Sequence, residues 1–294
     1  AMLLRRRADV VILTRVRDYW LGGLAARCAG VPALLRLGVV RRPRPNYVMD
    51  RLRYGALPSA LLVNAEAIRR TLMETPWMAS RKIHVVYNGV DAPGRLTSHD
   101  KVETRKRIGV SPEEMLIVGA GRLAVEKRWN WFVDAVADLV RSNYPVAARL
   151  LGQGGERDAI LARIHDKQLG DHFLLTGSRR DAQLWIASAD IVVLPSSNEG
   201  ISNVMLEAMG REVPVVATCS GGAGELFSDG RDVLMAATND FGEFARRLER
   251  AVKDEGLRRS IGRGGYDIVR ERLTWEAMTT SLERLLDSMA WSTP

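Results

Sequence analysis

The sequence predicts an α/β fold in which parallel sheets carry helices on both faces. Three observations lead to this prediction. Short runs rich in Val, Ile and Leu recur along the chain, segments with helical periodicity separate them, and 294 residues are enough for two domains. Strands that are buried on both faces and connected by helices form a doubly wound parallel sheet.

Ten apolar runs are typical of buried strands because Val, Ile, Leu and Ala dominate them. They lie at residues 9–13, 33–37, 60–63, 83–86, 115–118, 147–151, 173–175, 191–194, 213–217 and 232–235. Seven segments between them space their apolar residues as a helix does, at residues 21–29, 65–74, 129–141, 156–167, 182–188, 204–209 and 241–253. Beyond Arg258 we expect further helix, with Met278, Leu282, Leu285 and Leu286 on one face.

A turn-rich stretch, residues 88–94, interrupts this pattern, and the balance of charge changes at the same place. Residues 1–93 hold 16 Lys and Arg against 6 Asp and Glu, whereas the remaining residues hold 27 against 29. We therefore expect a partial N-terminal Rossmann-like domain over residues 1–92 and a complete one over residues 93–272. Residues 273–294 should form a C-terminal helix that packs back on the N-terminal domain.

Positive charge is concentrated in the N-terminal third of the chain. Its densest positions are Arg5, Arg6, Arg7, Arg41, Arg42, Arg44, Arg51 and Arg53. This asymmetry indicates either an anionic partner, such as an acidic lipid surface or a phosphorylated substrate, or a solvated arginine-rich surface. The stretch lacks the recognition motif of a nucleic-acid-binding module, so we expect no nucleic-acid partner.

Composition also limits the compartment and the chemistry. No apolar run approaches the roughly 18–20 residues of a membrane-spanning helix, and the chain starts with apolar side chains before charged ones, the reverse of a secretory signal. Cys28 and Cys219 lie far apart, and with four histidines they offer little material for a zinc site. We expect a cytoplasmic protein without a bound metal, able to make peripheral contact with the inner face of the membrane.

The strongest functional signal is the segment at residues 194–207, which follows a buried strand and enters a helix. Glu199 should lie in the loop at the carboxyl end of the strand, and Glu207 about one turn into the helix. The N–H groups at the start of that helix form an anion site that suits a diphosphate, and the two carboxylates could accept hydrogen bonds from sugar hydroxyls. Taken alone, the same two residues could cap a helix and face solvent.

Three further loops should meet at the same edge of the sheet. They are residues 119–127, 151–155 and 176–180, and each contains glycine that lets the backbone approach a ligand closely. Arg122 and Lys127 add positive charge there. Basic residues at a helix start oppose the helix dipole, so we expect an anion to compensate them.

Four motifs follow one another in this region. They are Asn-Gly-Val-Asp at residues 88–91, Gly-Arg-Leu-Ala-Val-Glu-Lys at 121–127, Glu-Gly-x-x-Asn-Val-x-Leu-Glu-Ala-Met at 199–209 and Pro-Val-Val-Ala-Thr-x-x-Gly-Gly-x-x-Glu at 214–225. With its Glu-x7-Glu motif the chain closely resembles the retaining glycosyltransferases of family 4, which have the GT-B fold, although its N-terminal domain is shortened. The resemblance covers residues 83–290 well and residues 9–82 loosely.

The resemblance implies transfer of a sugar, with retention at the anomeric carbon, from a UDP-, GDP- or ADP-linked donor to an anionic, lipid-linked or glycan acceptor. It implies no metal and no cofactor besides this donor. The domain at residues 1–92 would face the acceptor, and the domain at residues 93–272 would bind the nucleotide sugar. Arg122 and Lys127 would neutralise the diphosphate, and Glu207 would hold the ribose hydroxyls.

The implied catalytic residues are Glu199, which contacts the donor sugar, together with Arg122 and Lys127. The full implied donor-binding set is Gly121, Arg122, Lys127, Gly152, Ser178, Arg179, Glu199, Gly200, Ile201, Ser202, Asn203, Val204 and Glu207. On the acceptor side, the polar candidates are Arg15, Arg17, Asp18, Arg36 and Asn46.

The chain departs from the family pattern at three positions and in its first third. Arg128 stands where glycine usually follows the lysine, Glu212 occupies another glycine position, and Cys219 replaces an acidic residue. The strands and the glycine-rich loop that open a full GT-B N-terminal domain are absent from the sequence. Two functions therefore stay open, an active glycosyltransferase and a catalytically impaired nucleotide-sugar-binding module or fragment, whereas the motifs disfavour a sugar epimerase of the same fold.

Overall fold

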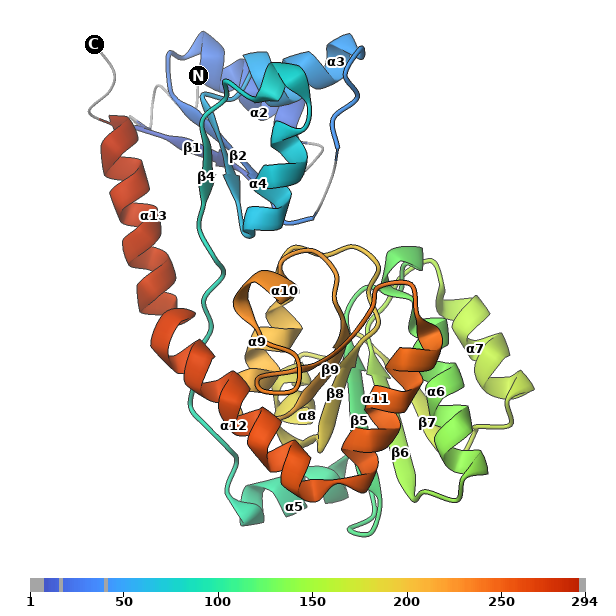
Figure 1. Ribbon diagram of the computed structural model, residues 1–294. Helices are drawn as coiled ribbons and strands as arrows, with labels where there is room; N and C mark the ends of the chain where they lie inside the picture. The colour runs from blue at the N-terminus through green and yellow to red at the C-terminus, as the bar shows by residue number, and fades with distance from the viewer. Residues whose placement is uncertain (1–7, 16–17, 40–41, 291–294) are drawn as a thin grey trace. The chain divides into compact units, whose positions relative to one another are not determined.

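The computed structural model describes residues 8–15, 18–39 and 42–290. Five arginines named above lie outside the described residues, namely Arg5, Arg6, Arg7, Arg17 and Arg41. The chain divides into two compact units (Figure 1). Unit 1 gathers residues 1–89, 199–201 and 275–294, and unit 2 gathers residues 90–198 and 202–274.

The described part of unit 1 contains a parallel sheet of four strands in the order β1-β2-β3-β4. These are β1 (Val11–Leu13), β2 (Ala33–Leu37), β3 (Ala60–Val63) and β4 (Ile83–Val85). The connecting helices are α2 (Asp18–Cys28), α3 (Val48–Asp50), the π-helix η1 (Arg51–Ala56), α4 (Glu66–Met73) and the 3₁₀-helix η2 (Pro76–Met78). The helix α13 (Trp275–Ala290) packs on this sheet, where Leu285 joins a buried cluster with Leu34, Ala60 and Leu62.

Unit 2, all of whose residues are described, contains a parallel sheet of six strands in the order β10-β9-β8-β5-β6-β7. These are β5 (Met115–Ala120), β6 (Val146–Leu151), β7 (Phe173–Gly177), β8 (Ile191–Leu194), β9 (Val215–Thr218) and β10 (Leu234–Ala236). Its helices are α5 (Ser98–Arg107), the 3₁₀-helix η3 (Val125–Lys127), α6 (Trp129–Arg141), α7 (Arg157–Asp166), α8 (Ala182–Ser188), α9 (Asn203–Met209), α10 (Ala223–Leu226), α11 (Phe241–Lys253) and α12 (Glu255–Arg272).

Helices cover both faces of the unit 2 sheet (Figure 1). On one side α6 packs against α7 and α11, and on the other α8 packs against α5 and α9, which in turn contacts α12. In chain order, β6 pairs with one side of β5 and β7 follows β6 on that side. The next strand, β8, pairs with the other side of β5, and β9 and β10 follow there, so the strand order reverses between β5 and β8. In an open parallel sheet, ligands bind at the carboxyl ends of the strands beside such a reversal.

The predicted fold class is confirmed, since both units are parallel α/β halves of the Rossmann type. Each of the ten predicted strands is present, with ends that differ from the prediction by at most two residues. Among the described residues, no helix combines the length and the apolar character that crossing a bilayer requires.

The helix α5 is not indicated by the sequence pattern, because all but one of its residues are polar. Its sole large apolar side chain, Val102, is exposed, so the helix has no apolar stripe. Its ends supply the local stabilisation instead. Thr97 Oγ1 accepts a hydrogen bond from the Asp100 amide at 3.1 Å as the N-cap, and the last turn is basic, as the helix dipole favours.

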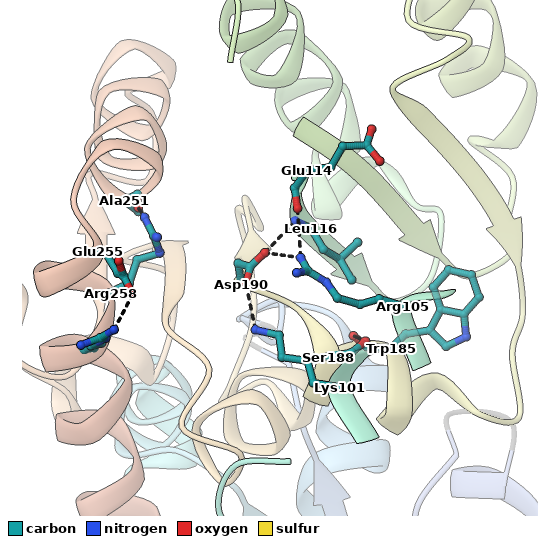
Figure 2. Close-up of polar contacts among 11 residues, drawn as sticks. Lys101, Arg105, Glu114, Leu116, Trp185, Ser188, Asp190, Ala251, Glu255 and Arg258 are labelled. Atoms are coloured by element: carbon teal, nitrogen blue, oxygen red, sulfur yellow. Dashed lines mark hydrogen bonds and ion pairs between the residues drawn. The ribbon is translucent and has the colours of Figure 1, made fainter. Parts of the chain in front are cut away.

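Asp190, at the amino end of β8, joins α5 to the sheet of unit 2 (Figure 2). Its carboxylate accepts hydrogen bonds from Lys101 Nζ at 2.8 Å, from the Arg105 guanidinium, and from the Leu116 amide at 2.9 Å. Arg105 also donates to the carbonyl oxygen of Glu114 at 3.2 Å. One carboxylate thus connects α5, β5 and β8 at the amino edge of the sheet.

Replacing Asp190 by alanine should lower the free energy of unfolding by about 2 kcal/mol, because two cations and a backbone N–H lose their acceptor. Urea denaturation followed by circular dichroism measures this loss. Asp138→Ala is the matched control, since the Asp138 carboxylate pairs with Arg141 at an exposed position and its loss should change stability by less than about 0.5 kcal/mol. Equal losses in the two variants would contradict the role of Asp190.

Candidate functional site

Four loops of unit 2 leave the carboxyl ends of β5, β6, β7 and β8, and they contain most of the predicted site residues. The loops after β5 and β8 start from adjacent strands at the reversal in strand order. The loops after β6 and β7 start from the next two strands on the β5 side. The sheet order therefore brings these loops to one edge, as the sequence predicts.

Backbone contacts join the loops after β5 and β6. The Gly121 amide donates to the Leu151 carbonyl oxygen at 2.9 Å, and the Leu123 amide donates to the Gln153 carbonyl oxygen at 3.0 Å. A Cβ on Gly152 would lie only 1.8 Å from the carbonyl oxygen of Gly121, and the φ angle of Gly152 is +153°. Only glycine fits at position 152, because any side chain would push the two loops apart.

The loop after β5 ends in the turn η3, and Arg128 separates this turn from α6. Here the structure corrects the sequence prediction that Arg122 and Lys127 lie at a helix start. Helix α6 begins only at Trp129, so neither basic residue opposes its dipole from within the first turn. Trp129 Nε1 donates to the Arg122 carbonyl oxygen at 2.8 Å and holds the loop against the helix.

Arg122 and Lys127 have different surroundings at this edge. The Arg122 side chain is 70% exposed, and its guanidinium pairs with Glu126 Oε1 at 2.7 Å. Lys127 lies against Gly121, since a Cβ on this glycine would be 3.9 Å from Lys127 Nζ. The ammonium of Lys127 is thus placed beside bare backbone at the carboxyl end of β5.

The loop after β8 is fastened to the turn after β5. Both the amide and Oγ of Ser197 donate to the carbonyl oxygen of Glu126, at 2.8 and 3.1 Å. Ser202, the N-cap of α9, makes no side-chain capping hydrogen bond within the described structure. Asn203 and Val204 form the first turn of this helix, so the predicted residues 202–204 surround its N-terminus.

Glu207 lies further along α9, between the buried residues Leu206 and Ala208. Its side chain is half-buried, and this burial raises the pKa of the Glu207 carboxyl. Hydroxyl donors would stabilise the ionised form of such a carboxylate, because they replace the water that burial has removed.

Glu199, Gly200 and Ile201 are grouped with unit 1. There the Gly200 amide donates to the Gly38 carbonyl oxygen at 3.3 Å, and Asn64 Nδ2 donates to the Ile201 carbonyl oxygen at 3.4 Å. A Cβ on Gly200 would lie 2.3 Å from Asn64 Oδ1, so this position requires glycine. The donor-binding roles of these three residues stay predictions.

Ser178 and Arg179 are exposed in the loop after β7. Arg179 donates to both carboxylate oxygens of Asp181, at 2.9 and 3.1 Å, and these hydrogen bonds are the main reason that the pKa of Asp181 falls to about 2. The guanidinium carbon also lies 5.3 Å from the centre of the Trp185 ring. Arg179 is therefore held by its own loop, and its contact with a nucleotide base stays a prediction.

Three residues at this edge are missing from the sequence prediction, namely Glu126, Ser196 and Ser197. Ser196 is 1% exposed, and its Oγ has no hydrogen-bond partner among the described residues. A pair of serines one residue after a buried strand is the signal that could have indicated two of them. The role of the Glu126 carbonyl group could not be found from the sequence, because it is a backbone contact.

The opposite, amino edge of the unit 2 sheet carries a hollow of about 270 Å³ lined by mixed charges. Its carboxylates are paired, since Asp190 contacts Lys101 at 2.8 Å and Glu212 contacts Arg95 at 3.0 Å. In the described part of the chain, no three His, Cys, Asp or Glu side chains gather as a metal site requires. None of the predicted donor residues lines this hollow.

Replacing Gly152 by alanine should displace the loop after β5, because the new Cβ would collide with the backbone of Gly121. We expect a loss of about 2 kcal/mol in the free energy of unfolding, as for other strained or overpacked sites. Gly155→Ala is the matched control, since a Cβ there meets nothing within 4 Å. Thermal unfolding of both variants measures the difference, and a Gly152→Ala variant as stable as Gly155→Ala would contradict the predicted clash.

Comparison with known proteins finds similarity to glycosyltransferases. Residues 114–254 match the family described as "Glycosyl transferases group 1". The lipopolysaccharide core biosynthesis glycosyltransferase LpsE of Rhizobium meliloti is 29% identical over 238 residues, which are 81% of this chain and 67% of LpsE. A D-inositol 3-phosphate glycosyltransferase of Stackebrandtia nassauensis is 30% identical over 285 residues, which are 87% of this chain and 64% of the relative.

Among solved structures, that of Anabaena Alr3699/HepE in complex with UDP and glucose matches 98% of this chain and 80% of its own, with a TM-score of 0.87 and 22% identity. This likeness establishes the fold, two Rossmann-like halves as in GT-B glycosyltransferases. Residues 114–254, which include the strand reversal and the loops around Arg122 and Lys127, are thus similar to the glycosyl transferases of group 1.

Proposed function

We propose that this protein is a retaining glycosyltransferase of family 4 that uses a nucleotide-diphosphate sugar as its donor. The observation that carries the proposal is the meeting of Arg122, Lys127 and the glycine-rich backbone of the loops after β5 and β6 at the reversal in strand order. This is the edge at which open α/β sheets bind nucleotides.

In this proposal the diphosphate lies beside Gly121. The absence of a side chain at this position lets a phosphate approach the backbone, and Lys127 Nζ is already adjacent. Arg122 reaches the same group by exchanging its exposed contact with Glu126 for a phosphate oxygen. These cations would stabilise the diphosphate as it gains negative charge on leaving, so we propose that no metal ion is needed.

The two carboxylates of the Glu-x7-Glu motif take separate roles. Glu207, desolvated on α9, would accept hydrogen bonds from the ribose hydroxyls, and Glu199 would contact the donor sugar. The bond between the anomeric carbon and the diphosphate breaks while the acceptor oxygen bonds on the same face. The leaving phosphate oxygen takes the proton of the acceptor hydroxyl, so no second carboxylate of the hydrolase kind is required.

We propose an anionic acceptor, lipid-linked or part of a glycan, and peripheral contact with an anionic membrane from the cytoplasmic side. The excess of 16 basic over 6 acidic residues in the first 93 supports this. Two similar proteins are named for a lipopolysaccharide core and for D-inositol 3-phosphate, which agree with an acceptor of this class.

The test is binding of UDP, GDP and ADP by titration calorimetry, followed by assay of sugar transfer from the matching donors. UDP comes first, because a structural neighbour holds it. One of the three nucleotides should bind, and its sugar donor should lose the sugar to an acceptor. Binding without any transfer would favour the nucleotide-sugar-binding module, and a protein that binds none of the three would overturn the proposal.

Lys127→Ala and Glu207→Gln should each weaken binding of that nucleotide by about tenfold or more, because each removes a charged hydrogen-bonding group worth about 1.5–3 kcal/mol. Both variants should unfold at nearly the parent temperature. Glu199→Ala should reduce binding of the whole nucleotide sugar, or its transfer, more than binding of the bare nucleotide. Three variants that bind and react like the parent would contradict the site assignment.

Donor binding should weaken as the pH falls through the raised pKa of Glu207. Ribose hydroxyls favour the ionised carboxylate, so affinity is complete above that pKa and declines below it, beginning above the range of an ordinary glutamate. Titration with the intact nucleotide sugar is suitable, since its diphosphate has no free terminal phosphate to titrate near neutral pH. Glu207→Gln should bind more weakly and lose this pH dependence; an unchanged pH profile in the variant would contradict the assignment of Glu207.

A further inference from the structure

Arg128 has an unusual backbone conformation for its residue type. Its φ and ψ angles are 50° and 42°, in the left-handed region that favours glycine. Three other non-glycine residues in the described chain also have a positive φ angle, namely Asn143, Gln168 and Glu212. An arginine side chain at such a position makes the folded chain less stable than glycine would, so its contacts must offset that cost.

The Arg128 side chain crosses the carboxyl edge of the sheet. Its guanidinium donates to the carbonyl oxygen of Thr238 and, at 2.9 Å, to Asn239 Oδ1. Both residues belong to the loop between β10 and α11, and β10 lies three strands away from β5, about 14 Å at the usual strand spacing. The side chain therefore connects loops that the sheet itself keeps apart.

Aromatic contacts support the same connection. The guanidinium carbon of Arg128 lies 4.7 Å from the centre of the Trp131 ring, a distance typical of a cation–π contact. Trp131 in turn meets Phe241, the first residue of α11, edge to face with ring centres 5.6 Å apart. The starts of α6 and α11 are thus packed together around the arginine.

Lys127 lies between two anchors. On one side the Glu126 carbonyl oxygen accepts both hydrogen bonds from Ser197 in the loop after β8. On the other side Arg128 is tied to Thr238 and Asn239 in the loop after β10. A turn that is fastened immediately before and immediately after one residue leaves the backbone of that residue little freedom.

We propose that Arg128 is a positioning residue that holds Lys127 in place for the donor diphosphate. The inference rests on the proposed function, because it concerns the same diphosphate site. Arg128 acts through the backbone of the turn and through the loop after β10, and it does not itself contact the nucleotide. Glycine would relieve the unfavourable backbone angle of Arg128, but it has no side chain that could contact Thr238 and Asn239.

The central test is Arg128→Gly, which relieves the backbone angle and removes the connection. The variant should unfold at the parent temperature or higher, yet bind the nucleoside diphosphate about fivefold more weakly, within the range of coupling between neighbouring residues. Its affinity for the corresponding nucleoside, which lacks the diphosphate, should be unchanged. A variant that binds the diphosphate like the parent, or loses affinity for the nucleoside equally, would overturn the inference.

Asn239→Ala tests the other end of the connection. It should weaken diphosphate binding in the same direction, and the double variant Arg128→Gly/Asn239→Ala should bind no more weakly than Arg128→Gly, because the two changes break one connection. Additive losses would overturn the inference.

Asn143→Gly and Gln168→Gly are the matched controls, since both residues share the left-handed backbone but lie at the helix ends that lead to the amino edge of the sheet. They should raise the unfolding temperature and leave nucleotide affinity unchanged. Nucleotide affinity that falls in these controls as it does in Arg128→Gly would overturn the inference. A parent protein that binds none of UDP, GDP and ADP would instead overturn the proposed function and this inference together.

Discussion

The close approach of backbone to backbone beside the strand reversal is the constraint on which the candidate site depends. Gly152 lies so near the carbonyl oxygen of Gly121 that no side chain could be present, and hydrogen bonds continue between the two loops beyond the strands. The loop after β5 is thereby extended along β6 before it turns toward β8. This path places Lys127 against Gly121.

Most of the fold could be predicted from the sequence, because buried parallel strands appear as short apolar runs whatever surrounds them. All ten strands follow this pattern. The helix α5 gives no comparable signal, since its sequence has no apolar stripe and its attachment depends on Asp190, 89 residues from Lys101. The sequence analysis also predicts no helix for the segment that forms α3 and η1, where the apolar side chains Val48, Met49 and Leu52 are exposed and mark no buried face.

For the candidate site, the sequence predicts which loops meet but not how their side chains are engaged. The sequence predicts that Arg122 and Lys127 lie at the carboxyl edge, as the structure has them, but the prediction that they lie at a helix start is wrong, because the turn η3 and Arg128 precede α6. Arg128 and Glu212, the two positions at which the sequence departs from glycines of the family pattern that it resembles, both have a positive φ angle. Sequence comparison alone could mark these departures, but it could not reveal that Arg128 contacts Thr238 and Asn239, or that Glu212 pairs with Arg95.

The charged side chains at the two edges of the unit 2 sheet differ in how firmly they are paired. At the amino edge, the carboxylate of Asp190 is enclosed by two cations and an amide, so these charges serve the fold and an incoming anion would have to displace several contacts. At the carboxyl edge, Arg122 contacts Glu126 of its own loop, and its side chain is 70% exposed. Such an exposed pair contributes less than about 1 kcal/mol, so a diphosphate can replace the carboxylate at little cost. The carboxyl edge can bind an anion because its Arg122–Glu126 pair is exposed, whereas the charges around Asp190 at the amino edge are enclosed. This difference matters more than the number of basic residues at each edge.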